Sequence, residues 1–257
     1  MGPRVGWCIL GFTPTAPKDL IPVPDYVQGS FVPISRLMHE WEFHSALALS
    51  PAEERTMVRE PAQAVPAAIA QRLGKLRVLG VAYIACLETG DVVSRLKPSG
   101  EAHTAAWVET PERINLLLAC RELDAHDTGF EFLGSVAELL RPRLTHSEVA
   151  AYSQILEEEM RHGVRGEIDE DALNSKQAYL PSRGGRRSRV QFEHYRDVSF
   201  VSTTAEYIHG LWHDVQIRVG PEHLPVAQLR RRMDLMAELF PPNPGYRVFD
   251  ETMEKAE

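Results

Sequence analysis

The chain has little of what identifies the commonest protein classes. It holds 3 cysteines in 257 residues, an odd and small number that excludes a disulfide-stapled scaffold. No segment approaches the roughly 20 consecutive apolar residues that cross a bilayer. The first residues also lack the apolar stretch of a secretion signal. We therefore expect a soluble protein of the reducing cytoplasm without a membrane span, in which the cysteines are buried free thiols.

An excess of positive charge is also missing. The formal net charge is -8 at pH 7, whereas nonspecific binding to nucleic acid depends on neutralising phosphates with Lys and Arg. Nucleic acid is therefore not expected as a ligand of the whole surface. A local cluster of arginines can still bind an anion.

Three widespread catalytic and nucleotide-binding motifs are absent as well. The sequence contains no Gly-x-Ser-x-Gly, no Gly-x-x-x-x-Gly-Lys and no Gly-x-Gly-x-x-Gly after a strand. Each motif supplies a nucleophile on a sharp turn or a glycine-rich cradle for phosphates. Their absence argues against the α/β-hydrolase, P-loop and Rossmann classes.

What is present is the composition of a globular protein, with 44% hydrophobic and 25% charged residues. Helix and strand patterns come in blocks rather than in βαβ alternation. This predicts an α+β fold with a largely antiparallel sheet and several amphipathic helices packed on it. We expect one globular domain over residues 1–257, with a subdivision near 166–189 between a helix-rich part, 1–165, and a strand-rich part, 190–257.

Capping and turn signals place some of these elements. Capping boxes that begin at Ser50 and Thr145 predict the starts of two helices, because the serine or threonine and the glutamate three residues later bond each other's backbone N–H. Residues 76–87 are apolar and rich in β-branched types. The turn chemistry that follows at 88–91 predicts a β-hairpin.

Periodicity places the others. A helix is expected after Thr110, since the apolar residues between 114 and 118 have helical spacing. Residues 190–219 contain apolar and polar residues in alternation, which predicts strands with one wet face. A closing amphipathic helix is expected over about 224–240.

The densest group of chemistry-bearing side chains lies within nine residues near the C-terminal end. It consists of Glu206, His209, His213 and Asp214. The two histidines are four apart, so they share a face in a helix and in a strand. Two imidazoles and a carboxylate can hold zinc or non-haem iron with coordination positions left open. This predicts, as one alternative, a small metal-dependent enzyme; the other interpretation is two buried histidines of a sheet.

The sequence does not choose the third ligand. Beyond this segment, the candidates are His194, His39, Glu40, Glu42 and His44. Two Glu-x-x-His pairs, at 159–162 and 206–209, have the spacing found at two-metal sites of helical bundles. A strand at 206–209 would point the two side chains in opposite directions, so we do not predict a two-metal site.

Arginines gather in a loop that precedes the predicted strands. They are Arg183, Arg186, Arg187 and Arg189, and they flank a Gly-Gly pair. Guanidinium groups and exposed backbone N–H groups together can bind a phosphate or an acidic surface. The sequence slightly favours an accessory or interaction protein that binds a protein partner or a phosphate-bearing, anionic ligand. The alternative for the loop is an exposed segment without a ligand.

Two further charged segments are interpreted as solvated surface. Gly166–Asp169 with Lys176 has the residue types of a metal-dependent nuclease site, but its polar neighbours indicate an exposed acidic turn. Arg230–Arg232 are consecutive on the expected closing helix. They fan around it, so we predict that their side chains are exposed.

Overall fold

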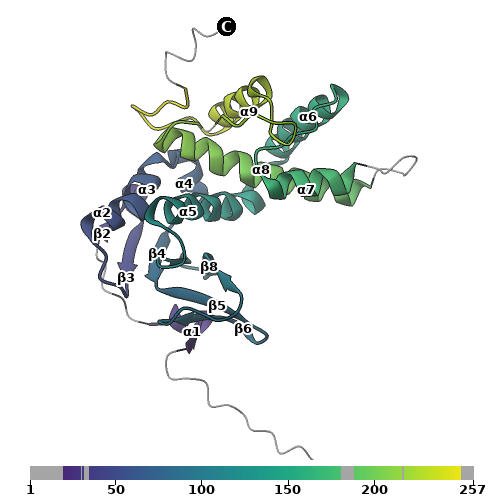
Figure 1. Ribbon diagram of the computed structural model, residues 1–257. Helices are drawn as coiled ribbons and strands as arrows, with labels where there is room; N and C mark the ends of the chain where they lie inside the picture. The colour runs from purple at the N-terminus through teal and green to yellow at the C-terminus, as the bar shows by residue number, and fades with distance from the viewer. Residues whose placement is uncertain (1–19, 30, 32–34, 181–187, 216, 250–257) are drawn as a thin grey trace, which may run out of the picture.

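The computed structural model describes residues 20–29, 31, 35–180, 188–215 and 217–249. Strands and short helices come first along the chain, and long helices follow (Figure 1). Most strand pairs are antiparallel. The predicted α+β fold is confirmed. Within the described residues, no helix combines the length and the apolar character that a membrane crossing requires.

The strands form two sheets. The first is antiparallel throughout, and its order is β1 (Leu20–Pro22), β6 (Gly90–Ser94), β5 (Tyr83–Leu87) and β7 (Ala102–His103). The second is mixed, and its order is β2 (Ser35–Arg36), β3 (Glu42–Ser45), β4 (Leu76–Val81), β9 (Ile114–Ala119) and β8 (Ala105–Glu109). In the mixed sheet, β4 pairs in parallel with β3 and with β9.

Short helices connect the strands, and long helices form the C-terminal half. The short ones are α1 (Val23–Tyr26), η1 (Met38–Glu40), α2 (Pro51–Glu54), the π-helix η2 (Arg55–Arg59), α3 (Glu60–Ala64), α4 (Ala67–Leu73) and η3 (Arg141–Arg143). The long ones are α5 (Ala125–Leu140), α6 (His146–Arg161), α7 (Glu170–Tyr179), α8 (Arg189–Trp212) and α9 (Val226–Leu239). Both predicted capping boxes are present, at Ser50 and Thr145.

The hairpin prediction is confirmed by β5 and β6. They pair from Tyr83 opposite Ser94 to Leu87 opposite Gly90. The apolar run 76–87 is divided at residue 82, where the chain passes from the mixed sheet to the antiparallel one. The helix expected after Thr110 is wrong, because this segment forms β9. Every residue of β9 is buried between β4 and β8, and a strand without a wet face gives a continuous apolar run that a helix also fits.

The strands expected over 190–219 are also wrong. Residues 189–212 form α8, and among the described residues that follow β9 the only β pairing is an isolated bridge between Glu167 and His223. Helices α3, α5, α6, α7 and α9 all pack against α8, so every residue from Ser202 to Leu211 is buried. A helix covered on all sides lacks the polar stripe by which amphipathic helices are identified. The predicted closing helix is confirmed as α9.

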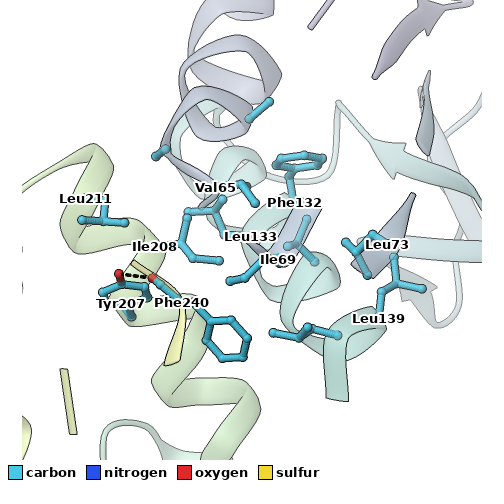
Figure 2. Packing of buried hydrophobic residues seen from close by; sticks show 14 of the residues in the cluster. Val65, Ile69, Leu73, Phe132, Leu133, Leu139, Tyr207, Ile208, Leu211 and Phe240 are labelled. Carbon is cyan, nitrogen blue, oxygen red and sulfur yellow. Dashed lines mark hydrogen bonds between the residues drawn. The ribbon is translucent and has the colours of Figure 1, made fainter. Parts of the chain in front are cut away.

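The main core lies where α8 meets α5 and the α3–α4 segment (Figure 2). Buried side chains converge there from all of these elements: Val65, Ile69, Leu73, Phe132, Leu133, Leu139, Ile208 and Leu211. Tyr207 adds a polar link, because its hydroxyl donates to the carbonyl oxygen of Phe240 over 2.7 Å. The same cluster includes residues of β4 and β9. The end of α8 is therefore held against α5 by a continuous apolar contact.

Candidate functional site

The predicted metal ligands lie at the C-terminal end of α8. Glu206 and His209 belong to its last turns, while His213 follows the last helical residue in an extended conformation. The helix removes the objection that a strand would separate Glu206 from His209, since residues three apart on a helix are neighbours. Glu206 Oε2 lies 4.0 Å from His209 Nδ1. His213 and Asp214 are both exposed.

A third histidine, which sequence reasoning missed, belongs to this group. His126 lies in the first turn of α5, where Asp124 caps the helix. Its Nε2 atom is 3.4 Å from Nε2 of His209, across a separation of 83 positions in the chain. The ring centroid of His213 lies 5.1 Å from that of His126 and 5.7 Å from that of His209. We call His126, His209 and His213 the histidine cluster.

Aromatic rings and a close contact between helices hold the histidine cluster in place. Trp212 stacks on His126 with a centroid distance of 5.2 Å, and Phe130 meets His209 edge-on at 5.3 Å. This packing requires glycine at 129, because a Cβ atom there would lie 2.6 Å from the Trp212 ring and 2.7 Å from a carbonyl oxygen of η2. The π-helical form of η2 is rare and occurs frequently at functional sites.

Burial keeps the central imidazole of the cluster neutral. His209 is only 2% exposed, and its Nδ1 atom has no hydrogen-bond partner among the described residues. Desolvation, together with the smaller effects of the nearby His126 and His213, lowers the pKa of His209 to about 4. Desolvation also lowers the pKa of His213. Because the neutral imidazole is the form that binds metal ions, His209 is ready for coordination at neutral pH.

The distance between His126 and His209 suits two ligands of one ion. With Zn–N bonds of about 2.0–2.1 Å in tetrahedral geometry, two ligating nitrogens lie about 3.3 Å apart, and the observed separation is 3.4 Å. The ring of His213, the third member of the cluster, does not complete this arrangement. Among the described residues, the only three side chains with ligand atoms all within 4.8 Å of one another are Cys86, Asp91 and His103.

A groove approaches the cluster from the side of Glu206. Its volume is about 610 Å³, and it runs between β7, β8, α5 and α8. Phe130 and Glu206 line it, and both lie against His209. Most of the charged side chains in its lining are acidic: Glu131, Glu138, Asp169, Asp171 and Glu206. The side chains of Phe130 and Glu206 therefore lie between the groove and the buried imidazole of His209.

Two of the other predicted ligands, His39 and Glu42, have partners elsewhere. His39 bonds through Nε2 to the Val65 carbonyl oxygen at 2.9 Å. Glu42 pairs with Arg113 at 3.3 Å. The neighbouring His44 is buried on β3, and neither of its ring nitrogens has a hydrogen-bond partner among the described residues. His194 is exposed on α8, and at 1.5 Å per residue it lies about 22 Å along the helix from His209.

Only Arg189, the last of the four loop arginines, lies within the described residues. Arg183, Arg186 and Arg187 lie outside the described residues, so their convergence on an anion stays a prediction. Arg189 begins α8 with a side chain that is 91% exposed, and it bonds to Glu193 at 2.8 Å. That contact is an i,i+4 pair on the helix surface.

Both segments interpreted as solvated surface contribute buried charges. Glu167 and Lys176 are fully buried and are joined over 3.0 Å. Arg232 is also fully buried and bonds to both Glu159 and Glu167. We call these four residues the buried ion network. Its two positive and two negative charges compensate each other, which makes burial tolerable. The prediction of exposure was wrong for Glu167, Lys176 and Arg232, whereas Arg231 is exposed as expected. The partners of Arg232 lie 65 and 73 positions away, so a sequence does not reveal them.

Comparisons of the chain with protein-family models, with curated proteins and with solved structures give no significant match.

Proposed function

We propose that the protein is a metal-dependent enzyme that binds a divalent transition metal, zinc in the first place, at the histidine cluster. The observation that supports this most is the 3.4 Å separation of the Nε2 atoms of His126 and His209. His213 is exposed and its ring centroid is 5.1 Å from that of His126, so a rotation of its side chain supplies the third ligand. Three histidines with one position left for water are a composition of catalytic zinc sites.

The position of Glu206 favours zinc over non-haem iron. The iron site that the sequence also allows would use two histidines and one carboxylate. Glu206 lies beside Nδ1 of His209, whereas the nitrogen that faces His126 is Nε2. A carboxylate on the far nitrogen orients a ligating histidine and increases its basicity, without binding the ion itself. We therefore assign Glu206 as a positioning residue and not as a ligand.

The competing explanation of the same distance is an N–H···N hydrogen bond between two neutral imidazoles. At 3.4 Å it would be longer than the usual 2.7–3.2 Å range for N–H donors. A metal ion bound by both Nε2 atoms accounts for their separation, whereas Nδ1 of His209 lacks a hydrogen-bond partner among the described residues in either explanation.

Metal binding by purified, chelator-treated protein tests the proposal. We expect one equivalent of Zn²⁺ at the cluster. Removing an outer-shell partner typically weakens metal binding about 10–100-fold, so we expect a loss in that range for Glu206→Gln. His126→Ala and His209→Leu remove ligands and should each cost more than 100-fold by the same scale. His146→Ala, an exposed histidine at the start of α6, is the matched control and should bind normally.

Two results would contradict the proposal. One is the absence of bound metal in the reconstituted wild-type protein. The other is equal zinc affinity in the wild type and in the His126→Ala/His209→Leu double variant, with circular dichroism showing that both are folded.

A further inference from the structure

A second group of metal-ligating side chains lies on the antiparallel sheet. Cys86 on β5 pairs directly with Asp91 on β6, and His103 belongs to β7 on the other side of β5. One sulfur, one carboxylate oxygen and one imidazole nitrogen of these residues all lie within 4.8 Å of one another. His103 Nε2 is 3.6 Å from Asp91 Oδ1. All three residues are partly buried.

The register of the sheet places the three side chains together. Directly paired residues such as Cys86 and Asp91 have Cβ atoms about 4.5–5.5 Å apart. His103 pairs with Ile84, two residues before Cys86. Alternation along a strand puts Ile84 and Cys86 on the same face, so His103 is a diagonal neighbour of the thiol. Strands hold such a constellation more accurately than loops do.

The same residue types occur in cysteine hydrolases, but this arrangement is not that of an activated nucleophile. A reactive cysteine needs a lowered pKa and a histidine acting as its base. Here, burial raises the pKa of the Cys86 thiol, and the negative charges of Glu101 and Asp91 raise it further. The thiol is therefore protonated at neutral pH and unsuited to nucleophilic attack.

The acidic surroundings of the thiol favour a cation. Asp91 is the direct strand partner of Cys86, and the backbone N–H of Cys86 donates to the carbonyl oxygen of Glu101 over 3.0 Å, so two acidic residues lie beside the thiol. A divalent ion that binds there exchanges with the thiol proton: Cys–SH and M²⁺ give a Cys–S–M bond and one released H⁺. Cysteine, histidine and aspartate are all ligands of zinc, and the sulfur selects against Mg²⁺ and Ca²⁺.

We propose that Cys86, Asp91 and His103 form a second metal site, which takes zinc or a similar thiophilic divalent ion. Three protein ligands leave one tetrahedral position for water or a small ligand. Asp91 and His103 line a cavity of about 650 Å³, together with mostly apolar residues: Pro22, Val23, Pro24, Val92, Ala105, Ala106, Trp107 and Val108. The open position therefore suits a small molecule with an apolar body. This site does not depend on the histidine cluster.

Titration with Co²⁺, followed by absorption spectroscopy, tests this site separately. A thiolate-to-cobalt charge-transfer band requires a sulfur ligand, and the histidine cluster has none. We expect the wild-type protein to develop the band as Co²⁺ is added, to reach its maximum with one Co²⁺ bound at this site, and to release a proton there. Cys86→Ser should abolish the band, while Asp91→Asn and His103→Gln should weaken Co²⁺ binding at least 10-fold. Cys120→Ala is the matched control and should retain the band. Cys120 is a free cysteine that is buried in the main core, away from the second site.

The outcomes separate the two sites. Failure of the histidine cluster alone would leave the charge-transfer band intact, also in the His209→Leu variant. Failure of the second site would appear as no charge-transfer band at saturating Co²⁺, or as a band that persists in Cys86→Ser. The near-ultraviolet circular dichroism of each variant establishes that it is folded, and Asp91→Asn provides a test that retains the thiol.

Discussion

The buried ion network and the histidine cluster both contact α8, but only the network satisfies its own polar atoms. Arg232 donates to Glu159 and Glu167 over distances of 2.5–3.0 Å. Lys176 and Tyr195 donate to Glu167 as well. In the cluster, His209 Nδ1 has no hydrogen-bond partner among the described residues, and Glu206 Oε2 is 4.0 Å away.

This difference separates a polar group that belongs to the fold from one that belongs to a site. Buried charges are tolerated when each has an opposite charge and its hydrogen bonds, as in the network. A desolvated nitrogen without a partner costs about 1–3 kcal/mol. A ligand that binds the imidazole through Nε2 offsets this cost in the bound state, because its binding energy stabilises the folded protein. The network should therefore be sensitive to truncation, whereas the cluster should be sensitive to metal.

The largest effect is expected for Arg232→Met. This variant leaves the carboxylates of Glu159 and Glu167 buried with one compensating charge fewer, and breaking a buried pair costs about 3–5 kcal/mol. Urea unfolding of the metal-free protein measures the loss. The control is Arg231→Met on the same helix, which removes an ion pair between the half-exposed Arg231 and Glu158 and should cost at most about 1 kcal/mol. Equal losses in the two variants would mean that the network does not stabilise the fold.

The second effect is a dependence of stability on pH in two separate windows. Desolvation lowers the pKa of His209 from 6.5 to about 4, so the folded state resists protonation. Its contribution is complete above pH 6.5 and is lost as the pH falls from 6.5 towards 4, by at most about 3 kcal/mol. Burial alone would raise the pKa of Glu167, but the charge of Arg232 outweighs it and lowers the pKa from 4.5 to about 2. That contribution is present above pH 4.5 and is lost below it.

Urea unfolding between about pH 8 and pH 3 in the presence of a chelator resolves these windows. His209→Leu should lose the decline between pH 6.5 and pH 4 and keep the decline at lower pH. If the wild type and the variant have parallel pH profiles, His209 is not held neutral by burial.

The parts of the fold that local patterns carry could be predicted from the sequence. The capping boxes at Ser50 and Thr145 depend on four consecutive residues, and the β5–β6 hairpin depends on a short turn between apolar runs. β9 and residues 202–211 of α8 could not be predicted, because both are buried on all sides. Such elements lack the polar face whose period of 2 or 3.6 residues distinguishes a strand from a helix.

The candidate sites divide in the same way. His209 and His213 are four residues apart, and their common face follows from any regular structure. His126 comes from α5, 83 positions earlier, and only tertiary packing joins it to His209. For the second site, the predicted hairpin does contain a usable signal, since a turn between 87 and 90 places Cys86 opposite Asp91. His103 depends on the position of β7, which the sequence does not show.

The smallest effect, and the sharpest test of the comparison, is expected for His209→Leu without metal. The substitution removes a weak contact with His126 but also removes a desolvated nitrogen and fills similar volume, so the two terms oppose each other. The free energy of unfolding should change by less than about 1 kcal/mol. Zinc should then separate the proteins: at 100 times the dissociation constant the wild type gains about 2.7 kcal/mol, and the variant gains nothing at this site. If the metal-free variant already loses as much as Arg232→Met, the cluster is part of the scaffold like the network, and the contrast between them no longer identifies a site.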